Sequence, residues 1–151
     1  MTGSGFIPDE FVVPGGLVTD RFVLEPLGPQ HNGADYAAWT SSIDHIRATP
    51  GFTGLSWPAE MSLRQNAGDL SRHNDDFLAR HGFTYTVLDS HTRQVIGCVY
   101  LYPPRRPGTD VEVRSWVRAD RAELDIPLWH TVTGWLRERW PWSAPDYATR
   151  P

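Results

Sequence analysis

Hydrophobic and polar positions follow their most regular pattern in residues 83–140, where they predict three strands followed by a helix. Residues 83–88 alternate aromatic or aliphatic side chains with threonine, which is typical of a strand with one buried face. Residues 95–102 are almost continuously β-branched or aromatic, and this favours a central strand covered on both faces. These two strands, a third strand and the helix that follows it form the smallest unit of the chain that can bury a core.

The third strand of this unit, residues 111–117, alternates again. Its valines share one face, while Glu112, Arg114 and Trp116 share the other. The helix after Pro127 has apolar residues at spacings of three and four, which predicts an apolar stripe facing the sheet. The stripe consists of Leu128, Val132, Trp135, Leu136 and Trp140.

The chain before this unit predicts one strand and two helices. Residues 17–27 alternate well enough for an opening strand, and residues 32–48 have apolar positions at a helical period. A second helix is expected to start with Ser56 as its N-cap and Pro58 in its first turn, and to end at Gly82. This order predicts an α+β fold, in which helices flank a mixed, mostly antiparallel sheet in three layers (α/β/α).

Residues 17–151 are long enough for a single domain with its own core and short for two. Prolines and glycines interrupt residues 1–16, so we expect a loosely ordered N-terminal arm. Its apolar side chains, among them Phe6 and Phe11, leave two alternatives open: docking on the domain or on a second subunit. Three tryptophans within residues 135–142 predict either a thick aromatic core or an apolar contact surface.

Net charge, cysteine content and the spacing of histidines argue against several classes of function. The formal net charge of −4 argues against a nucleic-acid partner, which normally needs a clustered basic surface. The single cysteine, Cys98, excludes an internal disulfide framework and suits the reducing cytoplasm. The six histidines show no close pair at ligand spacing, so no metal site is expected. No signal peptide or transmembrane segment is recognisable, and we expect no membrane association.

Three stretches carry a resemblance to a known family. TDRFVLEPL (residues 19–27) has a Thr-x-Arg before alternating aliphatics, VIGCVYLYP (residues 95–103) contains Gly97, and EVRSWV (residues 112–117) places a Glu before a Trp. In this order they resemble the opening, third and fourth strands of the GNAT superfamily of acetyl-CoA-dependent N-acetyltransferases. The branch is the one that includes ribosomal-protein N-terminal acetyltransferases. The resemblance covers residues 17–140 and implies transfer of an acetyl group from acetyl-CoA to a small-molecule or peptide amine.

The resemblance also implies roles for two residues. Glu112 matches the general base that takes a proton from the acceptor ammonium, and Tyr147 is the candidate for the tyrosine that protonates the leaving thiolate. A structural alternative is open for each of them. Glu112 can be a strand carboxylate paired with Arg114 or Arg118, and Tyr147 can be a tail residue packed on the sheet.

By the same resemblance, the end of the fourth strand and the loop after it face the cofactor. The residues concerned are Trp116, Val117, Arg118, Arg121 and Asp125. In the family, glycines in this loop let the backbone approach the cofactor pyrophosphate at the start of the next helix. Here Asp125 and Pro127 stand in their places, as a helix N-cap and a first-turn residue. Asp125 adds a negative charge and Pro127 lacks an N–H donor, so we expect weak acetyl-CoA binding.

Family members continue past this helix with further strands and a helix, whereas only residues 141–151 follow here, with one short strand expected in residues 144–150. The resemblance therefore implies a C-terminally truncated sheet. Soluble proteins normally cover an unpaired sheet edge, which predicts a homodimer. Two function classes stay open. One is an acetyltransferase, and the other is a catalytically inactive GNAT-like module for binding or dimerisation.

Overall fold

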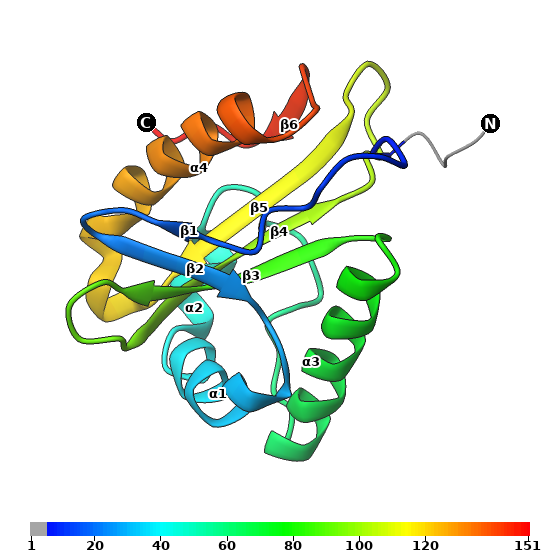
Figure 1. The fold of residues 1–151 in the computed structure, drawn as a ribbon. Coiled ribbons are helices and arrows are strands. Elements are labelled where there is room, and N and C mark those ends of the chain that lie inside the picture. The colour runs from blue at the N-terminus through cyan, green and yellow to red at the C-terminus, as the bar shows by residue number, and fades with distance from the viewer. Residues whose placement is uncertain (1–5) are drawn as a thin grey trace.

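The computed structural model describes residues 6–151, which form six strands and four α-helices (Figure 1). The strands are β1 (Leu17–Val18), β2 (Phe22–Pro26), β3 (Phe83–Asp89), β4 (Val95–Tyr102), β5 (Val111–Val117) and β6 (Pro145–Tyr147). The helices are α1 (Asn32–Thr40), α2 (Ile43–Ala48), α3 (Leu63–Leu78) and α4 (Asp125–Arg139). Two 3₁₀ turns, η1 (Pro29–His31) and η2 (Ala119–Leu124), precede α1 and α4.

The strands form one sheet in the order β1-β2-β3-β4-β5-β6. Neighbouring strands are antiparallel except for β5 and β6, which run parallel. Helix α4 lies on one face of the sheet, and α1, α2 and α3 lie on the other (Figure 1). The predicted α+β fold with a mixed, mostly antiparallel sheet in three layers is therefore confirmed.

The alternating residues of β5 separate two hydrophobic cores. Val111, Val113 and Val117 belong to the core under α4, whereas Trp116 belongs to the core under α1 and α2. The predicted alternation of this strand is confirmed. The two polar residues on the same face as Trp116, namely Glu112 and Arg114, belong to neither core and line a pocket described below.

Two predicted elements are divided in the structure. Residues 17–27 form the β1–β2 hairpin and not one strand, because Thr19 Oγ1 accepts a hydrogen bond from the Phe22 backbone N–H (2.9 Å) and stabilises a turn. Residues 32–48 form α1 and α2, with a break that includes Ser42. The spacing of apolar residues continues through the turn at Thr19 and through the break at Ser42, so the sequence pattern indicates neither of them.

The predicted start of α3 at Ser56 is wrong. The helix begins after Ser62, whose Oγ accepts from the Gln65 backbone N–H (3.0 Å) while Gln65 Oε1 accepts from the Ser62 backbone N–H (2.8 Å). This reciprocal capping box satisfies two backbone donors, where Ser56 offers a single cap. At the other end the helix stops at Leu78, before the expected Gly82, and Arg80 adopts the left-handed conformation with φ of 62°.

The N-terminal arm docks on its own domain. Phe6 and Ile7 are buried core residues, and the Phe6 ring stacks on Trp142 with centroids 5.2 Å apart. The Tyr85 hydroxyl donates to the Pro14 carbonyl (2.6 Å), which holds the arm against β3. Of the two alternatives for the arm, the structure shows docking on the domain, and the C-terminal tryptophans form a thick aromatic core. The part of the predicted arm in residues 1–5 lies outside the described residues.

Candidate functional site

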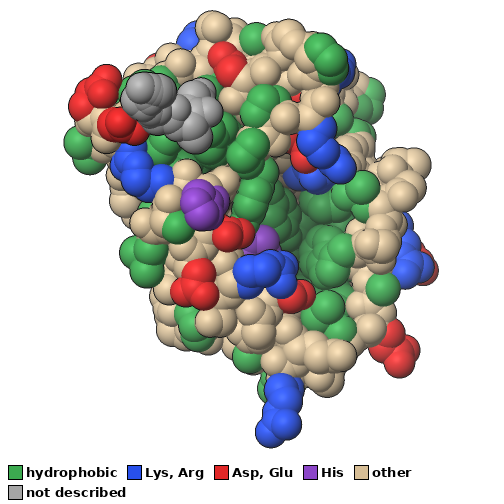
Figure 2. Space-filling model, turned by 90° about the vertical axis from the view of Figure 1, so that its right-hand side faces the viewer, with side chains coloured by type: hydrophobic (Ala, Val, Ile, Leu, Met, Phe, Trp, Pro, Cys, Tyr) green, Lys and Arg blue, Asp and Glu red, His purple; other side chains and the backbone are tan. Residues whose placement is uncertain are grey.

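A pocket of about 690 Å³ opens on the face of the sheet opposite α4. Strands β4 and β5, helix α3 and the loop between α2 and α3 supply its walls. Figure 2 shows a hollow with hydrophobic side chains inside and charged side chains around its rim. The loop is held against β4, because Phe52 and Trp57 contact the Tyr100 ring at centroid distances of 6.2 and 6.4 Å. Its size and its apolar lining with a few polar groups are typical of a small-molecule site.

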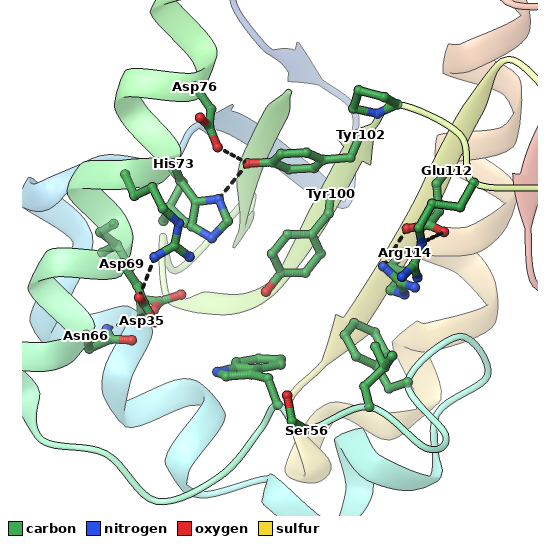
Figure 3. Close-up of a pocket in the computed structure, with 18 residues that line it drawn as sticks. Asp35, Ser56, Asn66, Asp69, His73, Asp76, Tyr100, Tyr102, Glu112 and Arg114 are labelled. Carbon is green, nitrogen blue, oxygen red and sulfur yellow. Dashed lines mark hydrogen bonds and ion pairs between the residues drawn. The ribbon is translucent and has the colours of Figure 1, made fainter. Parts of the chain in front are cut away.

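Glu112 lies at one end of this pocket, with both carboxylate oxygens engaged (Figure 3). Oε1 accepts from Arg114 Nη1 (2.8 Å), and Oε2 accepts from Arg105 Nε (2.9 Å). Arg114 is further fixed by donating from Nε to the Gly51 carbonyl (2.8 Å), whereas the Arg105 side chain is 69% exposed. The ion pair with Arg114 was the structural alternative for Glu112, and the structure contains it.

A polar network that the sequence did not reveal lies beside Tyr100 (Figure 3). The Tyr102 hydroxyl donates to Asp76 Oδ2 (2.9 Å) and lies 3.0 Å from His73 Nδ1. The same ring nitrogen lies 3.0 Å from Thr84 Oγ1, so His73 Nδ1 joins the hydroxyl groups of Tyr102 and Thr84. Burial lowers the pKa of His73 to about 4, so the ring is neutral at pH 7. The sequence holds one indication of this network, because His73 and Asp76 are three residues apart on α3 and face an aromatic strand.

Asp35 forms the floor of the pocket at the end away from Glu112 (Figure 3). Its Oδ2 accepts from Asn66 Nδ2 (3.1 Å), and Asn66 is oriented by accepting from Trp39 Nε1 (3.0 Å). Desolvation raises the pKa of the Asp35 carboxyl to about 6. Sequence reasoning missed this residue, because a lone aspartate in the first turn of a helix usually interacts only with the helix dipole.

Tyr147 and Glu112 lie on opposite faces of the sheet. Tyr147 pairs in register with Val113, packs under α4, and lies 2.5 Å from the Ser115 hydroxyl. Burial raises the pKa of Tyr147 to about 12, so the phenol keeps its proton at neutral pH. The two predicted catalytic residues are thus on neighbouring strands, but the structure does not bring their side chains together.

The residues expected to face the cofactor are already engaged within the protein. Trp116 and Val117 are buried in the two different cores. Arg118 pairs with Asp120 (3.0 Å). The partner of Arg121 is Asp89, on the β3–β4 hairpin (2.9 Å). A hydrogen bond from the Thr92 backbone N–H and the contact with Arg121 both hold the pKa of the Asp89 carboxyl well below its usual range. These side chains therefore do not converge on one anion.

Asp125 forms an ion pair with Arg150 at the start of α4. The Arg150 side chain is 1% exposed and donates from Nε to Asp125 Oδ2 (2.8 Å) and from Nη2 to the Ser115 carbonyl (2.9 Å). It therefore bridges β5 and α4. The predicted N-cap role of Asp125 is wrong, because α4 starts at Asp125, its N-cap position is Leu124, and no side chain caps it. The predicted first-turn position of Pro127 agrees with the helix bounds.

These contacts show how far the loop suits the pyrophosphate of acetyl-CoA. The Ala119 N–H donates to Ser42 Oγ (2.8 Å), and the Arg121 N–H donates to the Arg118 carbonyl (3.0 Å). Two backbone donors are thus satisfied within the protein. In this conformation the loop does not form a ready anion site, and the residues do not fit the pyrophosphate until the pair of Asp125 and Arg150 opens.

Within residues 6–151, no cluster of three or more His, Cys, Asp or Glu side chains has the arrangement of a metal site. In the same part of the chain, no helix has both the length and the hydrophobicity to cross a membrane.

Comparison with solved structures identifies the fold. A protein from Vibrio cholerae described as a ribosomal-protein-serine acetyltransferase superposes with a TM-score of 0.64 at 13% identity, over 88% of this chain and 70% of that one. RimL, a ribosomal L7/L12 α-N-protein acetyltransferase in complex with coenzyme A, gives 0.62 at 12% identity, over 80% and 67%. The microcin C7 self-immunity acetyltransferase MccE, in complex with acetyl-CoA and AMP, gives 0.61 at 12% identity, over 86% and 69%.

No model of a protein family and no curated protein matches the sequence. The structural similarity nevertheless shows the fold, which is that of the GNAT acetyltransferases. Within that class, its neighbours include ribosomal-protein N-acetyltransferases, as the sequence resemblance implied.

Proposed function

We propose that the protein transfers an acetyl group from acetyl-CoA to an amine that binds in the pocket beside β4 and β5. In the overall reaction the amine nitrogen forms a bond to the acetyl carbon, the carbon–sulfur bond of the thioester breaks, and the amine loses a proton. The observation that carries this proposal is the position of Glu112, a carboxylate at the edge of a 690 Å³ pocket in a GNAT fold. Structural neighbours in complex with acetyl-CoA or coenzyme A support the choice of co-substrate.

Glu112 is proposed to accept the proton of the amine through Oε2 once Arg105 turns away. The Arg114 guanidinium, which the Gly51 carbonyl holds in place, supports this role, since a nearby positive charge favours the neutral form of an amine over its ammonium. Tyr147 is proposed to return a proton to the thiolate, and its raised pKa keeps that proton available. Because Tyr147 lies under α4, on the face of the sheet opposite Glu112, it can act as the acid only if the thioester reaches both faces at the edge formed by β5 and β6.

The loop from Trp116 to Asp125 is proposed to face the cofactor mainly with its backbone. The side chains of Arg118 and Arg121 are paired with carboxylates, so they do not supply free charge. Opening of the Asp125–Arg150 pair would leave the Arg150 guanidinium near the start of α4, where it can balance a phosphate.

Replacing Glu112 with glutamine is expected to lower kcat at least about a hundredfold, because the amide cannot accept the proton. The measurement is the formation of acetylated amine, followed by mass spectrometry with acetyl-CoA and a panel of amines. Glu138→Gln, an exposed change on α4, removes the same charge and should leave the rate unchanged. If Glu112→Gln retains the parent rate while its melting temperature shows an intact fold, Glu112 is an ion-pair residue only.

We further propose a cytoplasmic homodimer. A single buried cysteine suits a reducing compartment. The arm covers the C-terminal tryptophans within the chain, so that surface is not free for a partner. The features that support a dimer are Val12 and Val18, which are 85% and 77% exposed on the arm and on the edge strand β1.

Light scattering at about 100 µM is expected to give the mass of a dimer. Val18→Lys should shift the mass toward the monomer, since an edge lysine opposes strand pairing. The exposed change Leu78→Lys on α3, away from that edge, serves as a control and should have no effect. A monomer mass for the unmodified protein contradicts the dimer.

A further inference from the structure

The two ends of the pocket carry opposite excess charge. Three aspartates line the wall at the end formed by α1 and α3, namely Asp35, Asp69 and Asp76. Of these, only Asp69 forms an ion pair with Arg72, with 2.8 Å between Oδ1 and Nη1. Asp76 accepts from a neutral tyrosine, and only the amide of Asn66 donates to Asp35 among the described residues. This end therefore has two carboxylates that form no ion pair within the described residues.

At the end formed by β5, the single carboxylate of Glu112 faces two guanidinium groups, those of Arg105 and Arg114. Its excess charge is positive. Figure 3 shows Asp35 and Asp69 on one side of the pocket, Glu112 and Arg114 on the other, and Tyr100 between them. A ligand that matches both ends places its cationic group at Asp35 and an uncharged group at Glu112.

Aromatic rings line the space between the two ends. The rings of Phe52, Trp57 and Tyr100 form a triangle, with centroid distances of 6.0, 6.2 and 6.4 Å. A point at equal distance from the three centroids can lie about 4–5 Å from each, inside the range of about 6 Å over which cation–π attraction acts. The apolar faces also suit the methylene groups of an alkyl chain.

The Asp35 carboxylate is held in a fixed orientation and can bind a cationic group of a ligand. The residue is 4% exposed, and Asn66 fixes its orientation through Oδ2, so a ligand can reach the remaining acceptor capacity from the pocket. A carboxylate buried to this degree costs free energy unless a cation or a further donor satisfies it. In residues 6–151 no Lys or Arg forms an ion pair with Asp35, and His31 is the one cationic group that acts on it electrostatically.

We propose that the pocket selects an amine that carries a second cationic group, as a linear diamine does. The second ammonium binds Asp35, the alkyl chain lies along Phe52, Trp57 and Tyr100, and the first amine reaches Glu112. There the Arg114 guanidinium, which stays paired with Glu112, favours its neutral, nucleophilic form. The fate of the first amine rests on the proposed acetyl transfer, whereas the binding of the second ammonium does not.

Calorimetric titration without acetyl-CoA tests the binding. A series of linear diamines of increasing length is compared with monoamines of the same length. We expect the best diamine to bind at least about tenfold tighter than its monoamine. Asp35→Asn keeps an acceptor for Asn66 and should bring the ratio close to one. Asp44→Asn, an exposed change on α2, removes the same charge and should keep the ratio.

Two results overturn the inference. One is equal binding of diamine and monoamine by the unmodified protein, and the other is an unchanged preference in folded Asp35→Asn. If Asp35→Asn does not fold, Trp57→Leu decides, because loss of this ring should weaken diamine binding several-fold, and an unchanged affinity refutes the site. Acetyl transfer separates the two proposals. Bound but unreacted diamine contradicts the proposed function alone, and acetylation of other amines without a diamine preference contradicts this inference alone.

The preference should also depend on pH. Asp35 has a pKa of about 6, so its charge, and with it the attraction for an ammonium, increases as the pH rises through that value. The groups that face it are His31, Asp69, Cys98 and Tyr100. Burial raises the pKa of Cys98 and of Tyr100 well above their usual values, so both stay neutral here. A diamine preference that is constant between about pH 5 and pH 7 contradicts the role of Asp35.

Discussion

Replacing Asp125 and Pro127 together with glycine is expected to strengthen acetyl-CoA binding by a factor of about a hundred. Removal of the carboxylate abolishes a repulsion of about 1 kcal/mol for each phosphate charge in a solvated site. It also frees the Arg150 guanidinium, whose side chain is 1% exposed in the ion pair. The glycine at position 127 adds a backbone donor, and a hydrogen bond to a charged acceptor contributes about 1.5–3 kcal/mol.

The measurement is calorimetry of the double variant and the parent protein with acetyl-CoA. Glu138→Gln removes one negative charge from the opposite end of α4 and should bind like the parent. Equal micromolar affinity in the parent and in the double variant contradicts the account, because the loop would then hold phosphate as it is. A loss of binding in the double variant would show that the Asp125–Arg150 pair builds the site instead of closing it.

Gly97→Ala is expected to destabilise the fold by at least about 3 kcal/mol, which for a chain of this size lowers the melting temperature by roughly 10 °C. A Cβ atom at Gly97 would lie 2.3 Å from the Trp116 carbonyl oxygen, so β4 and β5 would have to separate. This close approach gives a physical reason for the glycine in the VIGCVYLYP stretch.

Thermal denaturation followed by circular dichroism measures this effect. Gly134→Ala is the matched control, because a Cβ at this position in α4 meets nothing within 4 Å. That change should be neutral or stabilise the protein by up to about 1 kcal/mol, since alanine favours a helix over glycine. A melting temperature of Gly97→Ala equal to that of the parent would mean that β4 and β5 are not packed as closely as described.

The sequence predicted the centre of the fold well, because alternation and apolar spacing there follow directly from burial. Strands β4 and β5 have the predicted bounds, and the valines of β5 separate from Trp116 as expected. Local signals failed where a tertiary contact or a reciprocal cap decides, as at the β1–β2 hairpin and at the start of α3. The burial of Phe6 in the core was one of two alternatives, and only the packing decided between them.

The candidate site was less accessible to sequence reasoning. Glu112 was found because the resemblance points to it, and the structure places it at the pocket. Asp35 and His73 come from helices far from β5 in the sequence, and no local pattern joins them to it. The partner of Asp125 could not be predicted either, since Arg150 reaches it across 25 residues and no periodicity links the two.

The central claim is that this GNAT fold uses acetyl-CoA, and a calorimetric titration of the unmodified protein with acetyl-CoA tests it most directly. The account predicts saturable binding with one molecule per chain and a Kd weaker than about 100 µM, because the Asp125–Arg150 pair must open first. Absence of binding up to about 10 mM, both in the parent and after Asp125 and Pro127 are replaced with glycine, would contradict the claim. The fold would then serve as a binding or dimerisation module without catalysis.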